Sequence, residues 1–123
     1  MQKILLDTCG WVAIVDSGIH LDSELSKLVG NFELMLIESV NDELKDIATN
    51  RKGKLLMELL EAKSTNIPNP VGAGNHTDNQ LISLANQNSW PVITVDTELK
   101  QRLVKSGCKV IEIVQERRLR MIG

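Results

Sequence analysis

Four acidic residues stand where a shared chemical site would form. Asp7 directly follows the apolar run 4–6, and Asp96 directly follows the mostly apolar run 91–95. Short runs of this kind predict buried strands. Sites in parallel sheets form in the crevice at the carboxyl ends of the strands, so both carboxylates are expected at one edge of the sheet.

Helical periodicity adds two more acids to this edge. In the predicted helix 39–48, Glu43 lies beside Val40 at the margin of the apolar stripe. Asp78 shares a face with the apolar residues of the predicted helix 77–87 and lies in its first turn, where the helix dipole favours an anion. Both side chains are therefore expected to face inward.

Each acid alone has an ordinary explanation, but together they predict chemistry. Asp7 fits a turn at a strand end, Glu43 a surface ion pair, Asp78 a first-turn acid and Asp96 a helix cap. Four carboxylates at one edge would repel one another. Hard divalent cations with oxygen ligands, such as Mg²⁺ or Mn²⁺, relieve that repulsion, and metal ions bound in this way assist phosphodiester hydrolysis. Thr94 is expected on the same side of its strand as Asp96, where it would orient a water or a phosphate.

Strand-like and helix-like segments alternate along the chain and predict how these residues are positioned. Strands are expected at 3–6, 33–37, 91–95 and 109–114, with a further short strand at 64–68. Helices are expected at 11–15, 20–29, 39–48, 54–62, 77–87 and 97–105. The patterns S-x-x-D at 39–42 and T-x-x-Q at 77–80 predict capping boxes. The order favours an α/β fold with a mostly parallel sheet covered by helices on both faces, followed by a basic tail.

The composition limits the classes of function. The chain has 123 residues, a formal net charge of −2 and few aromatic residues. One domain, 1–123, is expected at this length, and the scarcity of aromatic rings argues against nucleic-acid binding by base stacking. Cys9 and Cys108 lack the spacing of a zinc site and are expected to be free thiols. With no visible signal peptide or long apolar run, the protein is expected in the cytoplasm.

The chain resembles the PIN-domain ribonucleases over nearly its whole length. The matching segments are KILLDT, SVNDEL, HTDNQLISLA and VITVDTELKQRL, which contain Asp7, Glu43, Asp78 and Asp96 in this order. The resemblance implies a three-layer α/β/α domain with a central, mostly parallel sheet. It also implies Mg²⁺- or Mn²⁺-dependent endonucleolytic cleavage of single-stranded RNA, with these four acids as catalytic residues and metal ligands.

Two further segments resemble one branch of that family. DSELSKLVGNFELMLIESVNDELKDIA and GCKVIEIVQERRLRMIG are similar to archaeal PIN proteins akin to the rRNA-processing endonucleases of the small-subunit pathway. VapC-like toxins are the next nearest group, although they usually lack such a last strand and basic tail. The resemblance favours rRNA processing with a ribosome-assembly partner and keeps open a toxin with an antitoxin partner. Family members often form homodimers, and the leucines of 54–62 fit either such an interface or the core.

The chain also departs from the family pattern at four positions. Cys9 stands where an Asn is common, and Asn79 replaces a second acid that often stands beside Asp78. Val95 and Thr97 stand where a polar residue and an arginine are frequent. The four principal acids are all present, so these departures concern the rate and the metal preference of the expected nuclease.

Basic residues outside the acidic site are the expected RNA contacts. Any one basic cluster, including that at 117–120, would alone be ordinary solvated surface. We favour the three basic residues expected in the turn after the Glu43 helix and one arginine on helix 97–105: Arg51, Lys52, Lys54 and Arg102. His76 precedes the Asp78 helix and fits either a loop residue without a role or a substrate contact.

Other classes of protein fit the sequence less well. Phosphatases of the haloacid-dehalogenase type need a second Asp two residues after the first, where this chain has Cys9. Receiver domains need an acidic pair after the first strand, which Leu6 and Asp7 do not supply. A catalytically weak PIN-like module that binds RNA or protein remains the non-enzymatic alternative, against which the four intact acids argue.

Overall fold

The computed structural model describes residues 1–48, 51–115 and 118–123, apart from the side chains of Arg51, Lys52 and Leu56. The strands are β1 (Gln2–Leu6), β2 (Phe32–Ile37), β3 (Ser64–Ile67), β4 (Val92–Ile93), β5 (Val110–Val114) and β6 (Arg118–Ile122). The helices are α1 (Thr8–Ser17), α2 (Leu21–Val29), α3 (Glu38–Ile47), α4 (Arg51–Lys63), α5 (Thr77–Asn88) and α6 (Thr97–Lys105).

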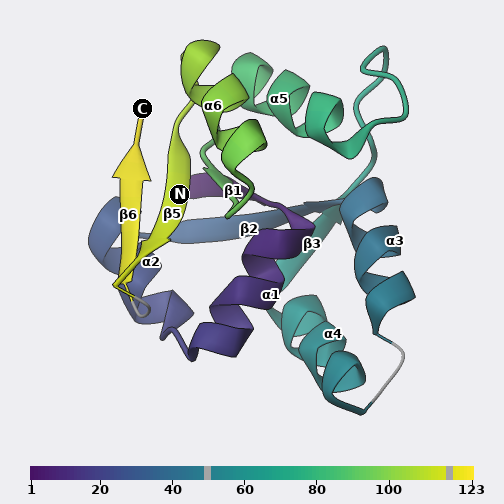
Figure 1. Ribbon diagram of the computed structural model, residues 1–123, viewed down its shortest axis with the longest axis vertical. Coiled ribbons are helices and arrows are strands. Elements are labelled where there is room, and N and C mark those ends of the chain that lie inside the picture. The colour runs from purple at the N-terminus through teal and green to yellow at the C-terminus, as the bar shows by residue number, and fades with distance from the viewer. Residues whose placement is uncertain (49–50, 116–117) are drawn as a thin grey trace.

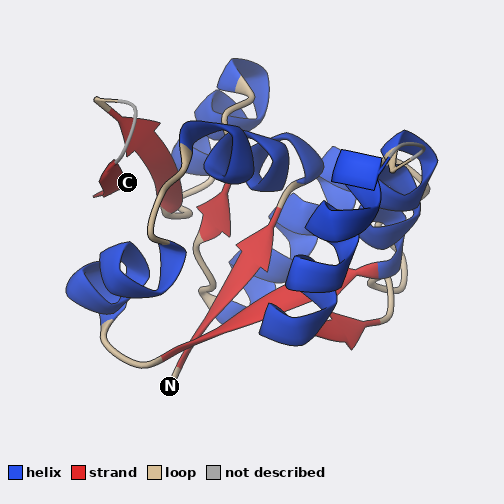
Figure 2. Cartoon of the chain, turned by 90° about the horizontal axis from the view of Figure 1, so that it is seen from below, coloured by secondary structure: helices blue, strands red, loops and turns tan. Residues whose placement is uncertain are grey.

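The six strands form one mixed sheet in the order β3-β2-β1-β4-β5-β6. All neighbouring strands pair in parallel except β5 and β6, which are antiparallel. Figure 1 shows α5 and α6 on one side of the sheet and α1, α2 and α4 on the other, and Figure 2 shows how strongly the strands twist between the helices. The expected α/β fold with a mostly parallel sheet between two helical layers is confirmed.

The direction of the strand connections changes at β1. Its neighbours are β2 on one side and β4 on the other, so the chain winds away from β1 in both directions. In open parallel sheets, the crevice at such a switch point, outside the carboxyl ends of the strands, is where ligands bind. Asp7 directly follows β1, and Asp96 stands three residues after the end of β4. The topology therefore places both acids beside this crevice.

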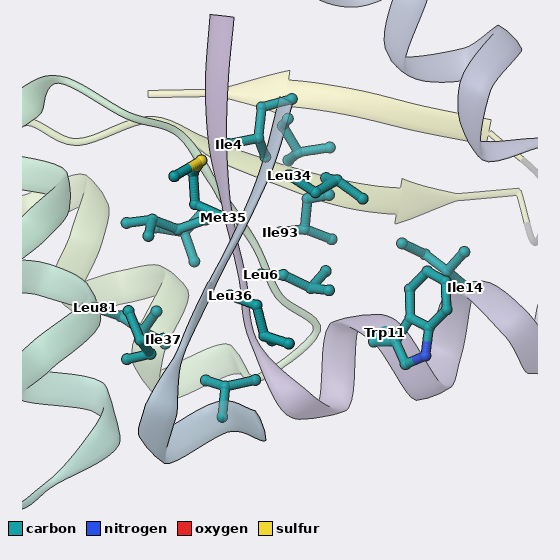
Figure 3. Close-up of a cluster of buried hydrophobic side chains, with 14 of the residues drawn as sticks. Ile4, Leu6, Trp11, Ile14, Leu34, Met35, Leu36, Ile37, Leu81 and Ile93 are labelled. Carbon is teal, nitrogen blue, oxygen red and sulfur yellow. The ribbon is translucent and has the colours of Figure 1, made fainter. Parts of the chain in front are cut away.

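The sheet is held by an almost entirely aliphatic core. The apolar run of β1 is fully buried, as expected for a central strand of a parallel sheet. Figure 3 shows Leu6 and Leu36 pointing to the side of the sheet where Trp11 of α1 lies, whereas Met35 and Ile37 point to the opposite side. The period of two along β2 thus supplies apolar side chains to both helical layers.

The C-terminal segment corrects the sequence prediction. The part of the expected basic tail that the structure describes forms β6, which pairs antiparallel with β5. Leu119 is only 7% exposed, while Arg118 and Arg120 on either side of it are exposed. The backbone N–H of Leu119 donates to Oε1 of Glu24 in α2 at 3.2 Å, which attaches the new edge strand to a helix.

Both predicted capping boxes are wrong. The N-caps of α3 and α5 are Ile37 and His76, and neither has a side-chain capping bond. Asn69 in the loop before α5 accepts instead from the Ser39 N–H at 2.9 Å. A side chain that is distant in sequence thus satisfies the orphan donor that a local pattern was expected to satisfy.

The remaining global features are simple. Cys108 is buried and Cys9 half-buried, and both are free, as expected. Within the described ranges, no helix combines the length and the apolar character needed to cross a membrane. The cytoplasmic location stays a prediction.

Candidate active site

The four acids predicted from the sequence line one pocket. A cavity of about 560 Å³ at the carboxyl edge of the sheet is bordered by Asp7, Glu43, Asp78 and Asp96. They come from the end of β1, from α3, from the first turn of α5 and from the start of α6. Segments separated by up to 89 residues of sequence are therefore brought together by the parallel sheet. Their catalytic and metal-binding roles stay predictions.

Asp7 is almost completely buried and is held by several donors. Its exposed fraction is 6%, and its backbone N–H continues the sheet by donating to the Ile93 carbonyl at 3.0 Å. Its Oδ1 accepts from the Thr8 N–H at 2.9 Å, which makes Asp7 the N-cap of α1. Its Oδ2 accepts from the Thr94 hydroxyl at 2.7 Å and from the Cys9 thiol at 3.0 Å. These bonds offset the cost of burying a carboxylate at the end of an apolar strand.

The structure corrects the expected role of Thr94. Its side chain is fully buried and does not line the pocket, so its hydroxyl does not face a water or phosphate there. The hydroxyl donates to Asp7 and accepts from the Asp96 N–H at 3.1 Å. Thr94 therefore links the ends of β1 and β4 and positions Asp7 and Asp96.

Cys9 supports Asp7 at the position where the resemblance led us to expect an Asn. Burial raises the pKa of its thiol first, and the hydrogen bond to Asp7 and the negative charge of that residue raise it further. The thiol thus stays protonated and remains a donor to Asp7 at neutral pH. The thiol thus donates a hydrogen bond to the Asp7 carboxylate, as the side-chain amide of an Asn at that position could.

Glu43 is clamped between two hydroxyl groups. Thr8 donates to Oε2 at 2.9 Å and Thr77 donates to Oε1 at 2.7 Å. The two threonines open α1 and α5, so Glu43 on α3 joins three helices around the pocket. Sequence analysis missed both threonines, although each stands next to a predicted site acid, Asp7 or Asp78.

Asp78 and Asp96 occupy different electrostatic surroundings. The pKa of Asp78 is raised, first by partial burial and then by the charges of Asp7, Asp96 and Glu43, while Arg102 opposes this effect. Asp96 is exposed and accepts from the Leu99 N–H at 3.1 Å as the N-cap of α6. Asp96 therefore caps α6, which is the ordinary explanation considered for it from the sequence, and it also borders the pocket.

The donor set fits a hard divalent cation in chemistry. Four carboxylates provide the oxygen ligands that Mg²⁺ and Mn²⁺ prefer, and carboxylates gathered in one pocket repel one another unless a cation lies between them. In the part of the chain that is described, no three His, Cys, Asp or Glu side chains converge into a preformed metal cluster. Several carboxylate oxygens instead accept from nearby hydroxyl, thiol and backbone N–H groups.

Two further residues, one apolar and one acidic, line the pocket. Ile47 of α3 is 54% exposed and lines the pocket. Asp16, two turns into α1, adds a fifth acid to its border. The pattern of α3 did not reveal this, because a residue at the margin of an apolar stripe can face either the core or a cavity.

The basic residues predicted to contact RNA belong to two different helices, α4 and α6. Residues 51–54 form the first turn of α4 rather than a turn between helices. The Lys54 side chain is exposed, and those of Arg51 and Lys52 lie outside the described residues. Arg102 is exposed on α6 and donates to Oδ1 of Asn79 at 2.6 Å, which places it next to Asp78.

Comparison with known proteins agrees with the fold. A curated relative, "Ribonuclease VapC4" of Methanocaldococcus jannaschii, is 26% identical over 129 aligned residues that cover 100% of this chain and 98% of its own length. A solved structure described as the PIN domain endonuclease Utp24 superposes with a TM-score of 0.82 at 19% identity, covering 97% of this chain and 90% of the other. This likeness shows a shared fold. The family model described as "PIN like domain" matches residues 4–116, and the chain belongs to this family.

Proposed function

We propose that this protein is a Mg²⁺- or Mn²⁺-dependent endoribonuclease that hydrolyses phosphodiester bonds in single-stranded RNA. The observation that carries the proposal is that Asp7, Glu43, Asp78 and Asp96, from four separate segments, line one pocket at the switch point of the sheet. Membership of the PIN-like family and the printed name of the VapC4 relative support a nuclease that acts on RNA.

The residues of the chain divide the work of such a reaction. A divalent cation held by these acids would stabilise charge on the phosphate and lower the pKa of a bound water. Asp7 is kept in one orientation by Thr8, Cys9 and Thr94. Partial burial and then its acidic neighbours raise the pKa of Asp78, and a cation held nearby would favour its ionised form.

The decisive experiment is the cleavage of an unstructured RNA with Mn²⁺. We expect activity in the wild type and its loss in Asp7→Asn and Asp96→Asn, because each variant removes a negatively charged oxygen ligand. Asp42→Asn is the matched control, since Asp42 is an exposed acid on α3 that does not line the pocket. Equal activity in wild type, Asp7→Asn and Asp96→Asn would indicate a contaminant and contradict the proposal.

A wild type that binds RNA normally but never cuts it would favour the alternative of a PIN-like binding module. Circular dichroism and thermal unfolding of each variant show whether an inactive protein is still folded. These controls matter at Asp7, which is buried and also caps α1. Asp96 is exposed, so its variant separates chemistry from folding more cleanly.

Two cellular roles follow from the family. rRNA processing with a ribosome-assembly partner is the role we favour from the resemblance, and a VapC-like toxin is the alternative that the full-length match to VapC4 supports. Induced expression in a bacterial host distinguishes them, because a toxin would arrest growth unless Asp7 is replaced by Asn. A toxin would also be expected to have a neighbouring antitoxin gene.

A protein partner would find apolar surface on α4. Met57 and Leu60 are buried in the core, whereas Leu55 and Leu59 are 56% and 42% exposed. The core thus explains only part of the leucine-rich sequence, and a homodimer or another protein partner is proposed for the rest. Sedimentation of wild type and Leu55→Ser checks for self-association.

The basic turn of α4 is proposed as a contact for the RNA backbone. Arg51, Lys52 and Lys54 begin the helix that follows α3, which carries Glu43. Phosphate contacts make RNA binding weaken as salt increases. Binding that is indifferent to salt would contradict this assignment.

A further inference from the structure

A second, polar groove adjoins the acidic pocket. It has a volume of about 550 Å³ and shares Glu43 and Asp78 with the pocket, so the two cavities lie next to each other at these residues. Its remaining lining consists of the loop before α5, the start of α5 and one residue of α6: Asn75, His76, Thr77, Asn79 and Arg102. Apolar side chains such as Val12 and Ile47 border the acidic pocket but not this groove.

Arg102 gives the groove a positive charge that forms no ion pair in the described part of the chain, although this charge also acts on Asp78. Its guanidinium donates to the neutral amide of Asn79 at 2.6 Å. Among the described residues, the ion pairs involve Lys27, Lys63, Lys100 and Arg120, and none of them includes Arg102. The neutral amide orients the guanidinium and leaves its charge available to an anion.

The loop that lines the groove together with Arg102 is anchored by Gln80. Gln80, which is 2% exposed, donates through Nε2 to the Gly74 carbonyl at 2.9 Å, and its backbone N–H donates to the His76 carbonyl at 3.1 Å. The exposed side chains of Asn75 and His76 are thereby presented on a restrained backbone. Amide and imidazole groups of this kind form hydrogen bonds with bases, sugars and phosphates.

We infer that this groove is a second subsite for single-stranded RNA, in which Arg102 binds a backbone phosphate next to the phosphodiester held in the acidic pocket. The inference rests on the proposed nuclease function, because it takes the acidic pocket as the place of cleavage. The strand passes Asp78 between the two cavities, and the Asn75–His76 edge lies where it contacts the flanking nucleotide. Arg102 thus offsets the repulsion that the acids exert on the substrate.

The test measures RNA affinity separately from cleavage. A fluorescein-labelled, unstructured 12-nucleotide RNA is titrated with protein carrying Asp7→Asn, so that the RNA stays intact, and anisotropy is followed at several salt concentrations. We expect Arg102→Gln to weaken binding about tenfold, as for a charged hydrogen bond. It should also reduce the slope of log affinity against log salt by about 0.7, as for one phosphate contact on a single strand.

Lys105→Gln is the matched control. Lys105 is exposed on the same helix, carries the same charge and lines neither cavity. We expect it to leave affinity and salt slope close to those of the background protein. If both glutamine variants behave alike, whether unchanged or equally weakened, the subsite is contradicted, because the effect would then be absent or due only to net charge.

Further variants and kinetics separate this inference from the proposed function. Arg102→Lys keeps the charge but not the bond geometry to Asn79, so an intermediate affinity is expected. In the active protein, Arg102→Gln should raise KM more than it lowers kcat. A wild type that fails to cleave RNA would contradict the nuclease proposal while the binding comparison at Arg102 would still decide on the groove.

Discussion

At the scale of single residues, the site depends on hydroxyl and thiol groups that hold the acids in place. Asp7 and Glu43 each have both carboxylate oxygens hydrogen-bonded. The donors are short side chains and backbone groups at the starts of helices or the ends of strands, where few rotamers are available. The carboxylates of Asp7 and Glu43 are thus held in fixed orientations, which would reduce the rearrangement needed to bind the proposed cation and substrate.

The threonine clamp on Glu43 provides a prediction at this scale. Thr77→Val keeps the shape of the side chain but removes the donor to Oε1 of Glu43. We expect RNA cleavage to fall about tenfold, as is usual when a group that orients a ligand is lost. Thr97→Val is a suitable control, because Thr97 is exposed at the start of α6 and lies outside both cavities.

The dependence of activity on Mn²⁺ concentration distinguishes a positioning role of Thr77 from general destabilisation of the protein. If Thr77 acts by orienting a metal ligand, Thr77→Val should require a higher Mn²⁺ concentration for half-maximal activity. A variant with unchanged metal dependence and unchanged rate would show that the hydroxyl is not needed to position Glu43.

At the scale of elements, the site depends on how closely α1 approaches the end of β4. A Cβ atom added to Gly10 would lie 2.6 Å from the Ile93 carbonyl oxygen. The same short approach allows the Asp7 N–H to reach that carbonyl and the Thr94 hydroxyl to reach the Asp7 carboxylate. Glycine at position 10 is therefore required by the contact between helix and strand.

Gly10→Ala tests this approach. We expect a loss of about 1–3 kcal/mol in the free energy of unfolding, because the clash is with backbone that cannot turn aside. Urea denaturation measures the change, and RNA cleavage should decrease as α1 moves away from β4. An unfolding free energy at or above that of the wild type would mean that α1 shifts at no cost, since alanine otherwise favours helices.

At the scale of the whole molecule, the sheet is extended by an edge strand that ion pairs secure. Glu112 on β5 accepts from Lys100 of α6 at 3.2 Å and pairs with Arg120 of β6. Arg120 and then Lys100 lower the pKa of Glu112 below its usual range. Arg120 of the antiparallel strand is thus matched by an acid within the fold.

The lowered pKa gives a pH prediction with a definite sign. Because folding favours the ionised form of Glu112, its contribution to stability is complete above the unfolded pKa, about 4.3. The contribution is lost as the pH falls through the lower pKa of the folded state. We expect Glu112→Gln to cost at most about 1 kcal/mol at pH 7, as for partly exposed ion pairs.

Thermal unfolding of wild type and Glu112→Gln between pH 7 and pH 3 measures this effect. The difference between the two melting temperatures should shrink toward the acidic end of the range. A difference that stays constant would show that the pairs do not contribute through the charge of Glu112.

The sequence by itself determined the central strands, the fold class and the convergence of the four acids. Apolar runs that end in Asp7 and near Asp96 mark central strands, and parallel strands bring their carboxyl ends to one edge. Local patterns suffice here because burial of β1, β2, β4 and β5 requires nearly continuous apolar sequence. The positions of Glu43 and Asp78 followed from the period of their helices.

Only the tertiary structure decided which partners those acids have. The hydroxyls of Thr8, Thr77 and Thr94 reach their carboxylates across 35, 34 and 87 residues of sequence, and no local pattern specifies such contacts. Local sequence also did not reveal that Asn69 accepts from the Ser39 N–H at the start of α3, or that the C-terminal segment forms β6 rather than a tail. Hydrogen-bond partners depend on which groups lie close together in the folded chain. Strands and helices depend instead on the local order of apolar and polar residues.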